Sequence, residues 1–168
     1  SGLYDLVKLN LSQPDVRSHL FDAGRLWVEA FGIDGLRLDA ADQIAPDFLQ
    51  ALAGYCRGLR SDFWLMGEMV HGDYRCLANP AMLDSATNYE CYKSLYSSHV
   101  DENYFEIAYA LNRQFGPAGL YRDLELYSFA DNHDVDRVSS SLRNPAHLYP
   151  LYLLLFAMPG IPSIYYGS

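Results

Sequence analysis

Three acidic residues each follow a short apolar run, and together they could cleave a glycosidic bond. Asp39 ends the run at 35–38, Glu68 follows Phe63 to Gly67, and Asp134 comes after the run at 126–130. A single carboxylate in such a place is more often a helix cap or a turn residue, but three are harder to explain in this way. Glycosidic cleavage needs two carboxylates: one attacks the anomeric carbon, and the other protonates the leaving oxygen and later activates water.

Arg37 lies two residues before Asp39. In a strand, residues two apart point to the same face, so the two side chains are expected to meet. The guanidinium can then hold the carboxylate ionised and oriented. A structural ion pair is the alternative interpretation of this spacing.

The elements that must position these residues alternate along the chain. The first helix is expected to start near Pro14, with Ser12 as its cap, and to stop at Gly32. Further helices are expected from Pro46 and at 90–96, 104–115 and 145–157. Apolar runs typical of strands lie at 35–39, 63–67, 82–85, 126–130 and 161–166. Short apolar strands that alternate with longer helices predict an α/β fold with a parallel sheet covered by helices. The carboxyl ends of such strands bring distant residues together.

Composition excludes some classes of protein. The net charge is −9, from 21 acidic and 12 basic residues, and this field would repel a phosphate backbone, so no nucleic-acid partner is expected. The apolar run at 148–157 is too short to span a bilayer, so no membrane association is expected. Aromatic residues make up 14% of the chain, with 14 Tyr. They suit core packing and sugar stacking equally well.

The three cysteines indicate the compartment. Cys56, Cys76 and Cys91 have no metal-like spacing and cannot all pair, so free thiols are expected. The chain begins Ser1-Gly2-Leu3 without a basic segment that would mark a signal peptide. Both observations favour a cytoplasmic protein.

Four segments resemble the α-amylase family of glycoside hydrolases. GIDGLRLDAA at 32–41 is similar to the family's fourth-strand motif, and LMGE at 65–68 to its fifth-strand motif. FADNHD at 129–134 resembles the seventh-strand motif, and GIPSIYYG at 160–167 the eighth-strand motif. The four occur in the family's order and extend over nearly the whole chain.

The resemblance implies a role for each matching residue. Asp39 would be the nucleophile, and Glu68 would be the acid/base, protonated when the bond breaks. Asp134 would bind the ring hydroxyls of the sugar under attack. Arg37 would orient the nucleophile, and His133 would hydrogen-bond the same sugar.

Two further basic residues are candidates for substrate binding. His71, shortly after Glu68, would line the acceptor side of the cleft. Arg137 would face the cleft, although a surface ion pair is equally compatible with its position. Asp42 and Gln43 stand where many α-amylases carry a Lys-His pair, which leaves the acceptor preference open.

Finer features concern the substrate. LVKLN at 6–10 resembles a segment of the neopullulanase, cyclomaltodextrinase and maltogenic amylase branch. Ala40, directly after the nucleophile, resembles enzymes that cut α-1,4 bonds. The resemblance therefore implies retaining hydrolysis of maltodextrins or cyclodextrins. The alternatives are a glucanotransferase, or a carbohydrate-binding or interaction module without catalysis on the same scaffold. No cofactor or metal site is expected in the chain, although family members often bind Ca²⁺ elsewhere.

The extent of the resemblance predicts a partial (β/α)8 barrel. The family's third-strand motif, D-x-x-x-N-H, does not occur, and the matched motifs span roughly strands 4 to 8. Residues 1–168 are expected to form the C-terminal half of a catalytic barrel, with no second domain. Such a half exposes strand edges and interior, so self-association or dependence on the other half is expected, with little hydrolysis by the chain alone.

Overall fold

The computed structural model describes residues 7–168. The segment 6–10 therefore lies mostly inside the described residues, while Leu6 and the chain start at Ser1 lie outside them. Within the described part, Lys8 donates from Nζ to the carbonyl oxygen of Gln43 at 2.7 Å. This contact ties the segment to the turn that follows the first strand.

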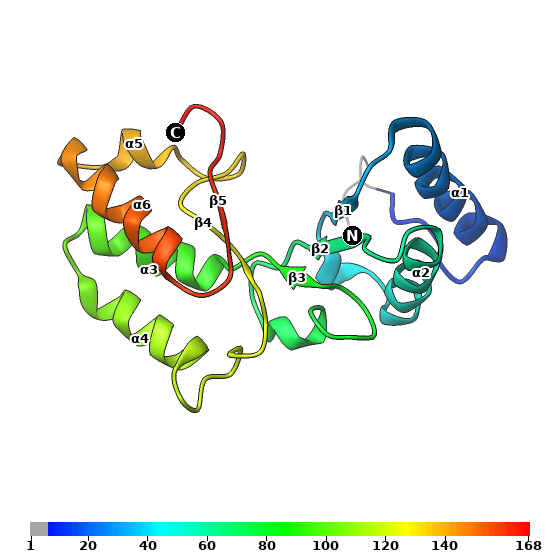
Figure 1. Ribbon diagram of the computed structural model, residues 1–168, viewed down its shortest axis with the longest axis horizontal. Coiled ribbons are helices and arrows are strands. Elements are labelled where there is room, and N and C mark those ends of the chain that lie inside the picture. The colour runs from blue at the N-terminus through cyan, green and yellow to red at the C-terminus, as the bar shows by residue number, and fades with distance from the viewer. Residues whose placement is uncertain (1–6) are drawn as a thin grey trace.

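Parallel strands form the centre of the fold (Figure 1). They are β1 (Gly35–Leu38), β2 (Trp64–Gly67), β3 (Ser85–Ala86), β4 (Tyr127–Phe129) and β5 (Ile161–Ser163). The first three pair in the order β1-β2-β3, and β4 pairs with β5, in each case parallel. A single parallel bridge between Thr87 and Tyr127 joins the two sets. The strands thus follow one another in chain order.

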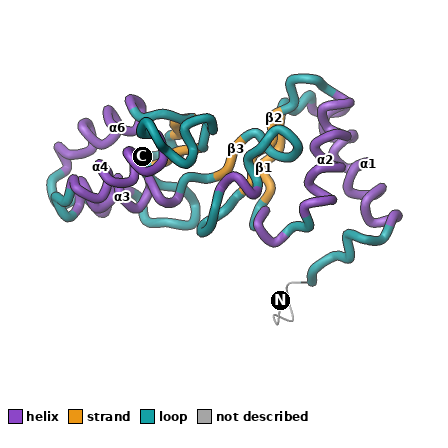
Figure 2. Tube along the Cα trace, turned by 90° about the horizontal axis from the view of Figure 1, so that it is seen from below, coloured by secondary structure: helices purple, strands orange, loops and turns teal. Residues whose placement is uncertain are grey.

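Helices precede β1 and occupy the connections between the strands (Figure 2). They are α1 (Pro14–Phe31), α2 (Pro46–Leu59), α3 (Tyr89–Val100), α4 (Tyr104–Phe115), α5 (Val138–Ser141) and α6 (Leu148–Ala157). The predicted alternation of parallel strands and helices is confirmed. Among residues 7–168, β1 and β5 do not pair with each other, so the described strands form an open sheet and not a closed barrel.

Helix α1 begins and ends for local reasons. Pro14 occupies its first turn, where its missing N–H costs nothing. Gly32 ends it in the left-handed region at φ 64° and donates to the carbonyl oxygen of Val28. The expected cap at Ser12 is wrong: the helix begins at Pro14, so Gln13 holds the cap position, without a side-chain hydrogen bond. The Ser12 hydroxyl donates to Asn10 at 2.6 Å.

Two strand predictions were misplaced. The run at 82–85 predicts a strand, but β3 covers only Ser85–Ala86, because Met82 and Leu83 belong to a buried turn before it. The last strand, expected to reach 166, ends at Ser163. Apolar content alone did not separate a buried turn or loop from a strand in these two places.

Two hydrophobic clusters form the core. The first packs β1, β2 and β3 against α1 and α2, and its fully buried members include Leu49, Leu65, Leu83 and Leu126. The second lies among α3, α4 and α6 and includes Cys91, Leu95, Leu151 and Leu155. None of the helices described in residues 7–168 is long and apolar enough to cross a membrane.

Candidate active site

One arginine bridges the first two predicted carboxylates. Arg37 contacts Asp39 Oδ1 through Nη1 at 3.0 Å and Glu68 Oε1 through Nη2 at 2.9 Å. Asp39 directly follows β1 and Glu68 directly follows β2, which pair in parallel register from Gly35↔Trp64 to Leu38↔Gly67. Because neighbouring strands end together, the two carboxyl groups lie within the span of a single guanidinium. The predicted Arg37–Asp39 contact is confirmed, and the contact with Glu68 was not foreseen.

The two carboxylates differ in exposure. The Asp39 side chain is 78% exposed, whereas that of Glu68 is 12% exposed. Asp39 is thus open to an incoming ligand, while Glu68 lies in a largely desolvated position. The two carboxyl groups therefore lie in different environments.

The backbone after Asp39 also contacts Glu68. Ala40 adopts the left-handed conformation at φ 42° and ψ 45°, and its N–H donates to Glu68 Oε2 at 3.0 Å. A left-handed conformation is unfavourable for a residue with a Cβ and is often found at functional sites. Both oxygens of Glu68 therefore accept hydrogen bonds from groups around Asp39.

Gly67 allows Glu68 to approach the turn after β1. A Cβ at this position would lie 2.6 Å from Leu83 Cδ1 and 2.8 Å from Ala41 Cβ. No side chain fits between these atoms without displacement. The absence of a side chain at Gly67 thus lets β2 and the following carboxylate pack closely against their neighbours.

The loop after β4 carries the third predicted carboxylate. Asp134 Oδ2 lies 3.1 Å from Nε2 of His133, and both side chains are about half exposed. The Asp134 N–H donates to Asn132 Oδ1 at 2.8 Å, and Asn132 Nδ2 donates to the Tyr89 hydroxyl at 3.1 Å. The loop is therefore tied to the first residue of α3.

Tyr89 links that loop to Glu68. Its hydroxyl lies 3.5 Å from Glu68 Oε1, and its ring packs edge-on against Phe129 at 4.9 Å between centroids. Burial raises the pKa of Tyr89, the hydrogen bond from Asn132 opposes this, and the charges of Glu68 and Asp134 add to the rise.

Asp131 holds the same loop in place through hydrogen bonds. It is buried, and its Oδ2 accepts from the Val138 N–H at 3.0 Å, while both its carboxylate oxygens lie 2.8 Å from the Ser168 hydroxyl. It therefore joins the segment after β4 to the segment after β5. This is a structural role for a residue within the FADNHD segment.

His71 lies apart from the carboxylate pair, on the wall of a cavity of about 620 Å³. This cavity lies between the loop after β2 and helices α3 and α4, and other residues that line it include Tyr89, Tyr92, Lys93 and Tyr109. Tyr89 lines this cavity and also contacts Glu68, so one side chain connects the two. The position of His71 is compatible with an acceptor side, and its contact with substrate stays a prediction.

Arg137 is held by aromatic side chains. Its guanidinium lies 4.9 Å from the ring centroid of Tyr165 and 4.8 Å from that of Tyr166, and it donates to the Tyr166 carbonyl oxygen. These contacts fasten the segment after β5 to the loop after β4. No surface ion pair of Arg137 is present among the described residues. Its contact with substrate stays a prediction.

Sequence reasoning missed Tyr89 and Asn132 as site residues. Asn132 stands inside the quoted FADNHD segment, and Tyr89 stands just past the end of β3. Tyr89 could have been found from its place shortly after a strand, because ligand-facing groups follow the carboxyl ends of strands. The predicted third strand at 82–85 ends before the observed strand Ser85–Ala86 does, so Tyr89 lies beyond the predicted strand end.

No group of three or more His, Cys, Asp or Glu side chains within residues 7–168 is placed to hold a metal ion. The three cysteines are free, as expected, with Cys56 and Cys91 buried and Cys76 exposed.

Parallel strands that alternate with helices and carry an arginine-bridged carboxylate pair at their carboxyl ends have the architecture of an α/β catalytic domain. Residues 2–168 match the family described as alpha amylase, catalytic domain. The chain belongs to the α-amylase family, which confirms the resemblance carried by its four motifs.

Individual relatives agree with this assignment. An intracellular maltogenic amylase from Bacillus subtilis (strain 168) is 26% identical over 98% of this chain. An α-amylase structure from Anoxybacillus superimposes with a TM-score of 0.85 at 31% identity, over 98% of this chain and 38% of that chain. A cyclic α-maltosyl-(1→6)-maltose hydrolase from Arthrobacter globiformis, in complex with maltose, gives a TM-score of 0.82 at 28% identity, over 99% of this chain and 38% of that chain.

The chain spans only part of these proteins. It covers 28% of the length of the maltogenic amylase. It covers 38% of each of the two structures, so the open sheet described above corresponds to part of their folds.

Proposed function

We propose that the protein carrying this chain is a retaining glycoside hydrolase that acts on α-1,4-linked glucans, such as maltodextrins and cyclodextrins. The observation that carries the proposal is the Arg37 bridge between Asp39 and Glu68. Retention requires two carboxyl groups about 5 to 5.5 Å apart, and one shared guanidinium suits such a separation.

In this proposal, Asp39 attacks the anomeric carbon and forms a β-linked glycosyl-enzyme, while Glu68 gives its proton to the leaving oxygen. Glu68 then removes a proton from the incoming water, and the sugar is released with its original configuration. Arg37 orients Asp39. Asp134 and His133 bind the hydroxyls of the sugar under attack.

The substrate class rests on the family and on the relatives. One relative is named an intracellular maltogenic amylase, and the structure of the Arthrobacter hydrolase is a complex with maltose. Any calcium requirement, like the cytoplasmic location, remains a prediction.

The test is an assay of the full-length protein on maltotriose, cyclodextrin, pullulan and isomaltose, with the anomer of the first product read by proton NMR. We expect release of the α-anomer from maltotriose and cyclodextrin. Release of the β-anomer would exclude the retaining mechanism. Products longer than the substrate would point to a glucanotransferase, and binding without turnover would point to a non-catalytic module.

A further inference from the structure

Within residues 7–168, the Glu68 carboxyl group has three hydrogen-bonding partners. Of these, Tyr89 alone can both donate and accept a hydrogen bond. The other partners are the Arg37 guanidinium and the Ala40 N–H, which only donate. A donor suits an ionised carboxylate. The proposed reaction, however, requires Glu68 to carry a proton in one step and to be ionised in the next.

Asn132 fixes the orientation of the Tyr89 hydroxyl. The Asn132 amide donates to the phenolic oxygen at 3.1 Å, and its own Oδ1 is occupied by the Asp134 N–H. The phenolic hydrogen is therefore free to point toward Glu68 Oε1, 3.5 Å away. This contact is long, but catalytic hydrogen bonds commonly tighten when substrate binds.

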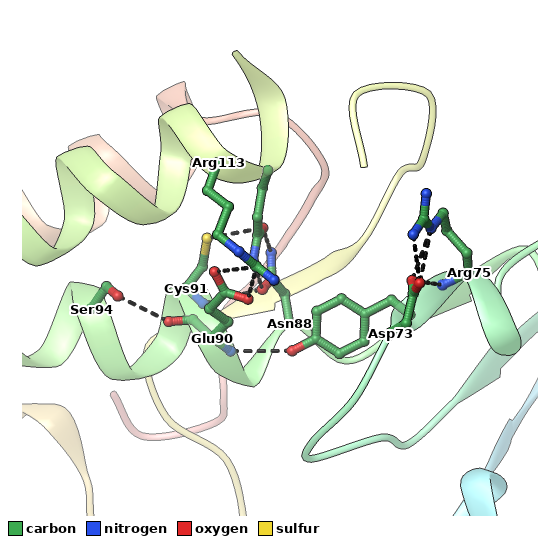
Figure 3. A network of polar contacts seen from close by, with 9 residues as sticks. Asp73, Arg75, Asn88, Glu90, Cys91, Ser94 and Arg113 are labelled. Atoms are coloured by element: carbon green, nitrogen blue, oxygen red, sulfur yellow. Dashed lines mark hydrogen bonds and ion pairs between the residues drawn. The ribbon is translucent and has the colours of Figure 1, made fainter. Parts of the chain in front are cut away.

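Both chain neighbours of Tyr89 are anchored (Figure 3). On one side, buried Asn88 exchanges two hydrogen bonds with Gln114 of α4, at 2.8 and 3.1 Å. On the other side, Glu90 pairs with Arg113 at 2.6 Å, and its N–H donates to the Tyr74 hydroxyl at 3.2 Å. The first turn of α3 is thus fixed against α4 and against the loop after β2.

The ring of Tyr89 is fixed as well. It packs edge-on against Phe129 of β4, and Tyr92 stacks on the same Phe129 ring at 5.1 Å. A phenol held at its backbone, its ring and its hydroxyl loses little freedom when it contacts a carboxyl group. Such preorganisation is what a positioning residue needs.

We propose that Tyr89, oriented by Asn132, is a positioning residue for Glu68, and that its hydroxyl keeps the Glu68 carboxyl group in place in both protonation states. The hydroxyl donates to the ionised carboxylate and accepts from the carboxylic acid, and it keeps its own proton throughout. The inference rests on the proposed function, since it concerns the acid/base step.

The test is Tyr89→Phe in the full-length protein, assayed on two substrates. Maltotriose needs protonation of its leaving oxygen, whereas α-maltosyl fluoride releases fluoride and needs little acid assistance. We expect kcat/KM on maltotriose to fall by about 10- to 100-fold and that on the fluoride by less than about threefold, because acid catalysis matters only for the first.

Controls separate this role from a structural one. Tyr96→Phe removes a hydroxyl from the same helix that makes no hydrogen bond within residues 7–168, and is expected to change neither rate. Equal losses on both substrates, or no loss on maltotriose, would overturn the proposal.

The two proposals fail in distinguishable ways. If the wild-type protein cleaves neither substrate, the proposed glycosidase function is wrong. If the wild type is active and Glu68→Gln abolishes cleavage of maltotriose while Tyr89→Phe leaves it unchanged, only the role of Tyr89 is wrong.

Discussion

The Ala40 N–H donates to Glu68 Oε2 at 3.0 Å, although Ala40 follows β1, Glu68 follows β2, and the two residues are 28 positions apart in the sequence. Ala40 makes this contact while it adopts the left-handed conformation at φ 42°. The residue after the proposed nucleophile is thus used to hold the proposed acid/base, so the two carboxylates are positioned as one unit.

Glycine at position 40 should stabilise the protein. Ala40→Gly is expected to raise the free energy of unfolding by about 1 kcal/mol, because glycine adopts φ 42° without steric cost. Glycine keeps the N–H, so activity should be retained. Urea unfolding of the full-length protein measures the change. Ala108→Gly, on the exposed side of α4, is the matched control and should lower the same quantity by about 0.5 to 1 kcal/mol.

Loss of the proposed nucleophile should abolish turnover. Asp39→Asn keeps the size of the side chain and removes its charge, so kcat on maltotriose is expected to fall at least about 10³-fold. Asp42→Asn changes an exposed carboxylate three residues later, which contacts only Gln43 among the described hydrogen bonds, and should leave kcat within about twofold. Turnover that survives Asp39→Asn would eliminate this residue as nucleophile.

The planar fork of Arg37 should matter as much as its charge. Lysine cannot reach Asp39 and Glu68 with two separate nitrogens, so Arg37→Lys is expected to lower kcat/KM about 10²-fold. Arg25→Lys makes the same substitution on the surface of α1, also without a change of charge, and is expected to have no effect. An Arg37→Lys variant with wild-type kinetics would mean that the bridge is not required.

Stability should depend on pH through His99. Burial lowers the pKa of His99, the hydrogen bond to the Leu95 carbonyl oxygen opposes this, and the neighbouring His147 adds to the lowering. The Tyr104 ring also packs against it. The unfolded chain therefore binds a proton more readily, and the contribution to stability is full above about pH 6.5 and is lost as pH falls below that value.

The measurement is the free energy of unfolding between pH 7.5 and about pH 5. His99→Gln should flatten this dependence, because glutamine does not titrate. His19→Gln, at an exposed position of α1, should leave it as in the wild type. An unchanged slope in the His99 variant would rule out this residue as the source.

The 168-residue chain by itself should self-associate. Helix α6 exposes Tyr149, Leu153 and Phe156, with exposed fractions of 81%, 71% and 53%, on an otherwise apolar sequence. Exposed apolar side chains grouped on one helix favour association. Gel filtration should give a species larger than a monomer, and Leu153→Lys should shift it toward the monomer. A clean monomer of the wild-type chain would contradict this expectation.

Much of the site could be predicted because its residues sit next to elements with strong patterns. Asp39 and Glu68 follow apolar runs that are strands, so their proximity follows from parallel pairing. The bridge from Arg37 to Glu68 could not be predicted, since it depends on the register between β1 and β2. Tyr89 was missed because β3 has only two residues, too few for a periodic pattern.

The hydrogen-bonding seam between β3 and β4 is narrow, with one bridge from Thr87 to Tyr127. Asp39 and Glu68 lie on one side of it, and Asp134 lies on the other. A sugar bound by all three side chains would therefore contact both sets of strands, β1 to β3 and β4 to β5, and would link them. Under the proposed function, binding of the substrate would therefore couple the two halves of the sheet mechanically.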